Sequence, residues 1–446
     1  MVKRKNIPTF LTSLLKNKEE SRYARMIYAA IILLFILSAR LFYMQVVEGS
    51  YYKEEADGNR IRSIPVQATR GVMYDRNGVI LAGSRPAYSV IMPVDRKGNT
   101  LSDDELQKLS VLLKMPVADL KKKIEDNKRA FGAIYLANDV GVDVATQIEE
   151  KKDDFPGIQI EVNPLRVYPL GAAGAQVLGY VGEAGPDDKD ADGNPYTTAT
   201  LIGRAGIERK YNQYLEGKNG SKTIEVNASG QPVGYVGGTP AVSGNNIRLT
   251  LDANLQKAAE DAIDSQVKIL AKSGIYATGA SAVAIDPNSG AVLAMVSEPS
   301  YDPNRFSKGI STADWNQIIN NKNHPMQNRT IASMYPPGSL FKVVTGAAAL
   351  EAKVMSPTER IFDSGKHWLV DKRNAQGEAF GWIDFYEALE KSDNVYFYEM
   401  GRRLGIDKLS QMAREFGLGK PTGIDLAGEA DGNVASEEYK KKVFDQ

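Results

Sequence analysis

A serine and a lysine lie three residues apart at the start of an apolar segment. Residues 334–344 read MYPPGSLFKVV, and Ser339 and Lys342 follow two prolines and a glycine. A helix beginning here places both side chains on one face, about 5–6 Å apart at Cβ. Its first turn supplies unpaired N–H groups and a partial positive charge. A lysine desolvated there can be neutral and accept a proton, so the pair predicts a serine nucleophile with a lysine base.

The same residues also fit a structural interpretation. Serine is a favoured helix cap, and a lysine one turn later is commonly solvated. Ser-x-x-Lys is a weak signal because the chain contains it three more times, at Ser13/Lys16, Ser50/Lys53 and Ser265/Lys268. Only Ser339/Lys342 combines a Pro-Pro-Gly turn with an apolar helix, and both interpretations of this segment stay open.

A second polar group follows at Ser392-Asp393-Asn394, before another apolar run. Ser392 could relay a proton between Lys342 and a reacting amine, and Asn394 could hydrogen-bond a substrate amide. Alternatively, Ser392 and Asn394 only cap the helix that begins at Val395. Ser-x-Asn also occurs at residues 243–245, so this motif is weak alone.

Composition limits the other chemistries. The chain has 446 residues, enough for two or three domains, with 43% hydrophobic and 25% charged residues. Lys+Arg and Asp+Glu both number 55, so no global charge favours nucleic acid. No cysteine is present, which excludes disulfides and cysteine-ligated metals. The two histidines, His324 and His367, lie in no recognisable nucleophile or metal motif.

The N-terminus predicts a membrane anchor. Residues 1–25 carry seven Lys/Arg and two Glu, and residues 26–47 are apolar except for Arg40. This segment is long enough to cross a bilayer, and its basic flank predicts a cytoplasmic N-terminus. A cleaved signal peptide is the rival, but no small-x-small site follows the apolar run. A buried core helix would leave the one-sided charge unexplained.

The remaining elements predict an α+β fold. Residues 70–82 form two apolar runs around Asn77-Gly78, which predicts a hairpin. Residues 103–154 are expected to be helical, and the glycine-rich residues 171–185 predict close packing or turns. Near residue 245 the pattern changes to a strand at 246–252, an amphipathic helix at 255–272 and two strands within 280–296.

Taken together, these segments resemble class B penicillin-binding proteins, the monofunctional peptidoglycan D,D-transpeptidases, and most of all their elongation-type group. RGVMYDRNGVILA and GRAGIERKYNQYLEG are similar to that family's N-terminal pedestal, and NRTIASMYPPGSLFK and FGLGKPTGIDLAGE to its transpeptidase domain. The resemblance implies a single transmembrane helix, an elongated strand-rich pedestal, and a transpeptidase domain whose antiparallel sheet is flanked by helices. The expected divisions are a cytoplasmic tail (1–25), a transmembrane helix (26–47), a pedestal of the dimerisation type (48–245) and a partial transpeptidase domain (246–446).

The resemblance also implies a function. Ser339 would be the nucleophile and Lys342 its base, with Ser392 and Asn394 completing the catalytic and substrate-binding residues. The chain would cross-link peptidoglycan stem peptides through a serine acyl-enzyme, would be acylated by β-lactams, and would need no metal or cofactor. Its expected partners are a SEDS-type glycosyltransferase, other wall-elongation proteins and the cytoplasmic membrane, with no nucleic acid. The catalytic domain would lie outside the cell or in the periplasm.

The chain departs from the family pattern in one respect. The third motif, Lys-Thr/Ser-Gly on a strand beside the cleft, is not found after Asn394. Lys272-Ser273-Gly274 precedes the nucleophile, and Lys420-Pro421-Thr422-Gly423 contains an extra proline. We therefore expect an incomplete transpeptidase domain, and a 446-residue chain that is inactive or poorly folded in its C-terminal half.

Three alternatives remain. A β-lactamase or β-lactam sensor would share the same chemistry, although the long pedestal and the anchor argue against a lactamase. A non-catalytic scaffold that activates a wall glycosyltransferase would explain the missing third motif.

Residues 188–193 resemble the front half of a calcium loop, but position twelve is Ala199, so a solvated acidic turn is favoured.

Overall fold

The computed structural model describes residues 20–93, 101–126, 133–185, 187–190, 193–196, 200–226 and 232–444. The Ser13/Lys16 pair, most of the basic N-terminal flank, Asp192 and Ala199 lie outside the described residues. Contacts within the chain define two compact units. One includes residues 1–66 and 219–241, and the other includes residues 67–94, 98–218 and 242–446.

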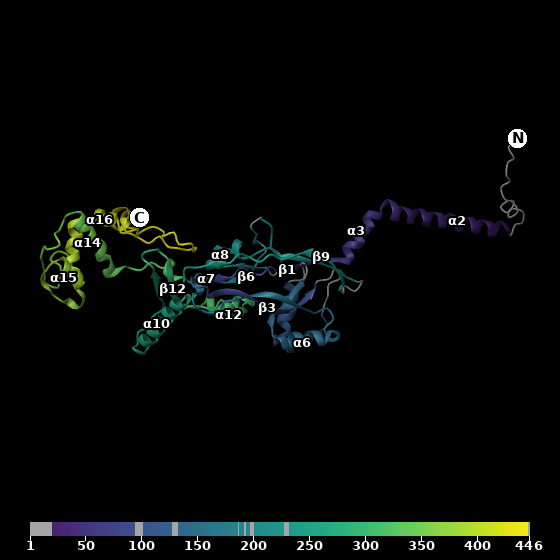
Figure 1. Ribbon diagram of the computed structural model, residues 1–446, viewed down its shortest axis with the longest axis horizontal. Helices are drawn as coiled ribbons and strands as arrows, with labels where there is room; N and C mark the ends of the chain where they lie inside the picture. Colours follow the sequence, from purple (N-terminus) through teal and green to yellow (C-terminus); the bar gives the residue numbers. More distant parts are fainter. Residues whose placement is uncertain are drawn as a thin grey trace, which may run out of the picture. The chain divides into compact units, whose positions relative to one another are not determined.

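The first unit begins with a long apolar helix. Helix α2 (Glu20–Phe42) continues into a π-helical turn, η1 (Tyr43–Val47), and is followed by α3 (Gly49–Arg60), as Figure 1 shows. The segment Tyr23–Val47 has a mean hydropathy of 2.1, and its apolar window is not buried against other parts of the chain. Its 25 residues are enough to cross a bilayer. The guanidinium of Arg40 lies 5.5 Å from the centre of the Tyr43 ring. The helix therefore fits the predicted membrane anchor.

A three-stranded antiparallel sheet completes this unit. Strand β8 (Gly220–Val226) lies between β1 (Ile61–Val66) and β9 (Pro232–Thr239). The register pairs Ile61 with Glu225 in one ladder and Ser221 with Thr239 in the other.

The second unit contains a five-stranded sheet. Its strands are β2 (Met73–Tyr74), β3 (Ile80–Pro93), β4 (Ala133–Val140), β5 (Gln159–Val167) and β10 (Ile247–Arg248). The predicted hairpin is confirmed, because β2 and β3 are antiparallel around Asn77 and Gly78. Gly78 has φ +90°, which favours glycine, and Asp75 accepts the N–H groups of Asn77 and Val79.

Helices cover this sheet beside strands β3 to β5. They are α4 (Asp103–Leu113), α5 (Val117–Asp126) and α6 (Val142–Glu150), followed by the short 3₁₀ turn η2 (Lys152–Asp154). Ser102 and Glu105 form a capping box at the start of α4. The expectation that all of residues 103–154 are helical is wrong at β4. There Ile134 and Leu136 alternate with partly exposed neighbours, because one face of the strand packs into the core.

The glycine-rich segment packs closely, as predicted. It includes α7 (Ala175–Leu178) and β6 (Val181–Glu183), which pairs with β7 (Leu201–Gly203) before α8 (Gly206–Lys210) and α9 (Asn212–Leu215). A Cβ at Gly179 would lie 1.9 Å from the carbonyl oxygen of Ala205. Nearby, the fully buried Glu208 pairs with the guanidiniums of Arg70 at 2.5 Å and Arg166 at 2.7 Å. This buried triad joins segments far apart in the sequence.

The helix and hairpin predicted after residue 245 are also confirmed. Helix α10 (Ala253–Lys272) is capped by Asp252 and contains the Ser265/Lys268 pair. Strands β11 (Ala280–Ile285) and β12 (Val292–Glu298) are antiparallel. The strand expected over 246–252 is shorter than predicted, since regular strand is limited to β10, although Leu249 and Asp252 still donate backbone hydrogen bonds to Tyr74 and Leu293. Three short helices follow, namely α11 (Asn304–Ser307), α12 (Thr312–Ile319) and α13 (Arg329–Ala332).

The last helices surround a core of their own. The 3₁₀ turn η3 (Gly338–Leu340) leads directly into α14 (Phe341–Glu351), and α16 (Asn394–Glu415) follows α15 (Phe385–Glu390). Strands β13 (Ile361–Asp363) and β14 (Gly381–Ile383) pair around the turn η4 (Ala375–Gly377), and α17 (Glu437–Phe444) ends the described chain. Small residues of α14, Gly346, Ala348 and Ala349, are buried, so α15 and α16 approach closely. Figure 1 shows α14, α15 and α16 in the yellow-green part of the chain.

Candidate active site

Ser339 lies in the turn that precedes α14. Gly338 adopts φ +59° and Pro337 caps the 3₁₀ turn, so the chain bends sharply before the helix starts. The Ser339 side chain is exposed, whereas Lys342, one turn later, is buried with 8% of its surface accessible. An accessible hydroxyl beside a buried amine is the arrangement that an activated nucleophile requires.

The Lys342 amine is surrounded by the loop that follows α15. Its Nζ lies 2.5 Å from the carbonyl oxygen of Ser392, 3.0 Å from Ser392 Oγ and 2.8 Å from Asn394 Oδ1. It also lies 5.7 Å from the centre of the Phe397 ring. These contacts fix the amine position between α14 and the start of α16.

Ser392 connects the amine to the exposed hydroxyl. Its Oγ lies 3.1 Å from Ser339 Oγ and 3.0 Å from Lys342 Nζ. Ser392 has φ +55°, a left-handed conformation that costs about 1–2 kcal/mol in a non-glycine residue and that is concentrated at functional sites. In this conformation both its carbonyl and its hydroxyl reach Lys342.

The same heavy-atom positions suit either protonation state of Lys342. A charged amine donates to Ser392 Oγ, and the Ser392 hydroxyl then donates to Ser339. A neutral amine keeps two N–H donors for the Ser392 carbonyl and Asn394, and its lone pair accepts the Ser392 hydroxyl proton. Ser392 Oγ is then free to accept the proton of Ser339. The hydrogen-bond chain can therefore carry a proton from Ser339 to Lys342 without moving a heavy atom.

Electrostatics shift the Lys342 amine toward its neutral form. Burial lowers the pKa of Lys342 below its usual value, and the carboxyl of Asp393 opposes this effect. Burial raises the pKa of Asp393, although N–H groups of the following helix oppose the rise. A more neutral Asp393 stabilises the lysine cation less, so both shifts act in the same direction.

Asn394 contacts Lys342 and a backbone carbonyl. Its Oδ1 accepts a hydrogen bond from Lys342, and its Nδ2 donates to the Arg373 carbonyl at 3.3 Å. The predicted contact with a substrate amide is not tested by these contacts. Asn394 is the first residue of α16, so the expected helix start at Val395 is correct to within one residue.

Two residues that support this loop carried no sequence signal. Asn374 and Asp363 are buried and hydrogen-bonded around the start of α16. Asp363 ends the short strand β13, and Asn374 lies in the irregular segment that follows. Neither has a hydrophobic period or a known spacing relative to Ser392, so pattern alone does not single them out.

His367 contacts Glu399 and backbone N–H groups, not the Ser339 site. His367 is buried, its Nε2 lies 3.2 Å from Glu399 Oε2, and its Nδ1 accepts the N–H groups of Leu369 and Val370. Those two N–H donors place the ring proton on Nε2, facing Glu399. His367 is thus part of a buried hydrogen-bonded cluster with Glu399.

The acidic turn has local partners too. Asp188 pairs with Arg204 at 2.8 Å and accepts the Gly185 N–H, while Asp190 accepts the Asn194 N–H. Among the described residues, no group of three or more His, Asp or Glu could hold a metal ion. The calcium interpretation gains no support from these residues.

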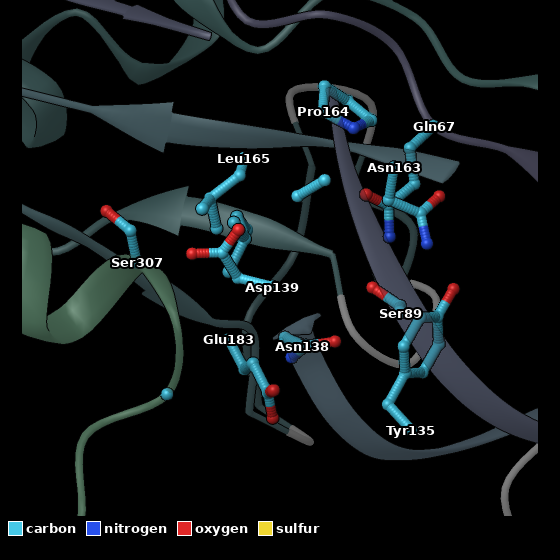
Figure 2. A pocket seen from close by; sticks show the side chains of 13 residues that line it. Gln67, Ser89, Tyr135, Asn138, Asp139, Asn163, Pro164, Leu165, Glu183 and Ser307 are labelled. Carbon is cyan, nitrogen blue, oxygen red and sulfur yellow. The ribbon is translucent and has the colours of Figure 1, made fainter. Parts of the chain in front are cut away.

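A separate pocket lies among the strands of the five-stranded sheet. Figure 2 shows its lining, which includes Tyr135, Asn138, Asp139 and Glu183 but none of the four predicted site residues. It encloses about 450 Å³, part of which is open to solvent. Burial alone would raise the pKa of Asp139, but ion pairs with Lys308 and Arg85 lower it overall. The lining of this pocket mixes polar and apolar side chains and does not include Ser339.

Comparison with known proteins agrees with the fold. Residues 65–249 match the family model of the penicillin-binding protein dimerisation domain, and residues 280–445 match that of the penicillin-binding protein transpeptidase domain. Fold and sequence thus define a penicillin-binding protein with an N-terminal apolar helix, a dimerisation domain and transpeptidase-domain sequence.

Relatives define the family more narrowly. The peptidoglycan D,D-transpeptidase MrdA of Escherichia coli K12 is 35% identical over 436 residues, which cover 95% of this chain and 66% of that protein. MrdA of Salmonella typhimurium is 32% identical and is covered to 68%. The chain belongs to this family of peptidoglycan D,D-transpeptidases. It spans 66% of the length of the Escherichia coli relative.

Solved structures show the same likeness. The penicillin-binding protein PBP2 of Helicobacter pylori, solved in complex with MreC, is 29% identical with a TM-score of 0.71. The match covers 86% of this chain and 70% of that one. A chain from a peptidoglycan synthase complex has a TM-score of 0.63 at 28% identity.

Proposed function

We propose that this protein is a serine-type peptidoglycan D,D-transpeptidase, with Ser339 as nucleophile, Lys342 as base, and Ser392 and Asn394 completing the site. The observation that carries the proposal is the hydrogen-bond chain from Ser339 Oγ through Ser392 Oγ to Lys342 Nζ, with links of 3.1 and 3.0 Å. Burial of the amine and the family membership support it.

The reaction is acyl transfer. Ser339 Oγ attacks the carbonyl of the terminal D-Ala-D-Ala bond of a stem peptide, and its proton passes through Ser392 to Lys342. The Oγ–C bond forms, the C–N bond breaks, and the proton returns to the leaving amine, so that D-alanine departs and an ester remains on Ser339. An amine of a neighbouring stem peptide then attacks the ester and its proton returns to Ser339. β-Lactams imitate the donor peptide and leave a slowly hydrolysed ester.

The N–H of Ser339 serves as one donor to the tetrahedral oxyanion. A family-type oxyanion hole takes its second donor from the Lys-Thr/Ser-Gly strand, and losing one donor costs about 10²–10³ in rate.

The proposed topology follows the charge pattern. Residues 26–47 anchor the protein in the cytoplasmic membrane with residues 1–25 inside, and the pedestal (48–245) and transpeptidase region (246–446) lie outside or in the periplasm. The anchor helix and its exposed apolar surface support this proposal. Cysteine-accessibility labelling on both sides of Val47 in intact cells tests it, and external labelling of residues before Met26 would contradict it.

Wall-elongation proteins are the proposed partners. The Helicobacter pylori relative was solved with MreC, and another relative in a peptidoglycan synthase complex. By analogy, we propose that this protein binds an MreC-type protein and a SEDS-type glycosyltransferase. Loss of co-purification with both partners from detergent-solubilised membranes would argue against this.

Labelling with a fluorescent penicillin tests the enzymatic proposal in the protein as the cell produces it. Wild type should form a stable adduct, Ser339→Ala should form none, and Ser410→Ala, which changes a buried serine elsewhere on α16, should label normally. Rapid nitrocefin turnover instead of a stable adduct would identify a β-lactamase. Normal growth supported by Ser339→Ala would identify a non-catalytic scaffold.

A further inference from the structure

The start of α16 is held by a residue that lies outside the Ser-x-Asn loop. The first N–H groups of an α-helix have no partner within the helix and must be satisfied from elsewhere. Here Asn374 Oδ1 accepts the N–H groups of Asn394 at 2.8 Å and of Val395 at 3.2 Å, and Asp393 Oδ1 accepts that of Tyr396 at 3.0 Å. The Asn374 side chain thus satisfies two of these three N–H groups from outside the helix.

A buried carboxylate fixes the orientation of this amide. Asn374 Nδ2 donates to Asp363 Oδ2 at 2.8 Å and to the Glu378 carbonyl at 3.0 Å. If the amide flipped, its NH₂ group would face two N–H groups and its oxygen would face two acceptors. Asn374 is 6% exposed and Asp363 is 1% exposed, so water cannot readily replace these bonds.

Asp363 is itself rigidly placed. It accepts the N–H groups of Gly365 and Phe380, each at a distance of 2.7–2.8 Å, in addition to the Asn374 amide. Asp393 is a close neighbour, is fully buried, and its Oδ2 receives no N–H or O–H from the described residues. Burial raises the pKa of Asp393, and the neighbouring Asp363 carboxyl adds to this rise.

The contact chain continues to the reacting groups. Asn394, whose backbone is fixed by Asn374, accepts a hydrogen bond from Lys342 through Oδ1. Ser392, two residues earlier, has a left-handed φ of +55° and is joined to Asn394 through Asp393. A shift of the α16 start would therefore move Asn394 Oδ1 and, through the chain, the carbonyl and hydroxyl of Ser392, which are the three polar contacts of the lysine amine.

We propose that Asn374, oriented by Asp363, is a positioning residue that sets the place of Asn394 and Ser392 around Lys342. This inference rests on the proposed function, because it concerns the efficiency of the Ser339–Ser392–Lys342 chain. Asn374 touches no reacting atom and acts through the first turn of α16.

The test compares variants in the protein as the cell produces it, using penicillin as the probe. Asn374→Ala removes both sets of hydrogen bonds. Asn374→Asp keeps an acceptor for the helix N–H groups but loses the donor to Asp363. Ser364→Ala is the matched control, because Ser364 lies on the same loop, is exposed, and donates to the Lys366 carbonyl only. For each variant, the acylation rate is measured from pH 5 to pH 10, with the thermal midpoint measured in parallel.

We expect Asn374→Ala to slow acylation at least tenfold, and Asn374→Asp to slow it less, with Ser364→Ala unchanged. The pH midpoint of the rate should shift to lower pH, because a displaced Asn394 no longer stabilises the Lys342 cation. The carboxyl of Asp393, the titratable group that acts on the amine, is unchanged in each variant. If Asn374→Ala fails to fold, Asn374→Asp decides the question.

An unchanged rate and midpoint in a folded Asn374 variant would overturn the inference. A lower thermal midpoint with an unshifted pH profile would also overturn it, since that result indicates a purely structural role. Absence of an adduct in wild type would instead overturn the proposed function, so the two failures are distinguishable.

Discussion

Replacement of Ser392 by alanine isolates the proton path from the rest of the site. The substitution removes the hydroxyl that lies 3.1 Å from Ser339 Oγ and 3.0 Å from Lys342 Nζ. It leaves the amine two acceptors, the Ser392 carbonyl at 2.5 Å and Asn394 Oδ1 at 2.8 Å. Lys342 should therefore stay in place while its hydrogen-bonded route to Ser339 is interrupted.

The size of the effect follows from this geometry. Positioned proton transfer contributes about 10²–10⁴-fold to a rate. Because the amine remains nearby and can still accept the proton through water, we expect a loss of about 10²–10³ in the acylation rate. This loss corresponds to about 2.7–4 kcal/mol at roughly 1.36 kcal/mol per tenfold change.

Stopped-flow acylation by a chromogenic or fluorescent penicillin measures the loss. Ser392→Gly separates the hydroxyl from the backbone conformation, because glycine adopts φ +55° without strain. Ser410→Ala is the matched control on α16, where the serine hydroxyl donates to the Asp407 carbonyl. Acylation rates within threefold of wild type for both Ser392 variants would refute the relay. A slower rate in Ser392→Ala but not in Ser392→Gly would assign the effect to strain in the loop.

Three further predictions concern the fold. Glu208→Gln should lower the free energy of unfolding by about 3–5 kcal/mol in urea, because it leaves the buried Arg70 without its charged partner; a change below 1 kcal/mol would be inconsistent with the triad. Gly179→Ala should lower it by about 1–3 kcal/mol or prevent folding, because the added Cβ would lie 1.9 Å from the Ala205 carbonyl oxygen at φ +80°; an unchanged melting temperature would disprove the clash. Burial, with nearby carboxylates, raises the pKa of Glu298 from 4.5 to about 7. Between pH 4.5 and pH 7 the folded protein therefore keeps a proton that the unfolded chain loses, and the free energy of unfolding falls as the pH rises. Glu298→Gln should reduce this pH-dependent fall by about 1–2 kcal/mol after allowance for solvent screening, and the same pH dependence of the melting temperature in wild type and variant from pH 4 to pH 8 would contradict it.

Periodicity and turn chemistry predicted the elements that depend on local sequence. The hairpin follows from Asn77-Gly78, where Gly78 has a positive φ. Helix α10 follows from its apolar stripe, and Asp252 caps its N-terminus. Strand β4 was missed because Ile134 and Leu136 lie between helical segments, and its place depends on pairing with distant β3. Such long-range pairing is not encoded in a local window.

The candidate site was predictable where its residues are close in sequence. Ser339 and Lys342 share one turn, so their spacing alone places them together. The Ser392 hydroxyl between them depends on a left-handed backbone and on the packing of α14 against α16. Asp363, at the end of β13, and Asn374, in the following loop, lie beside α16 because of tertiary contacts, which local sequence does not predict.

Mapping the penicillin adduct by mass spectrometry tests directly whether Ser339 is the nucleophile. After brief exposure of the protein as the cell produces it, followed by proteolysis, we predict one adduct, on the Ser339 hydroxyl in the peptide containing Lys342. The adduct should be absent from a folded Ser339→Ala variant. An adduct on any other residue, or one that persists in Ser339→Ala, would contradict the assignment of the nucleophile.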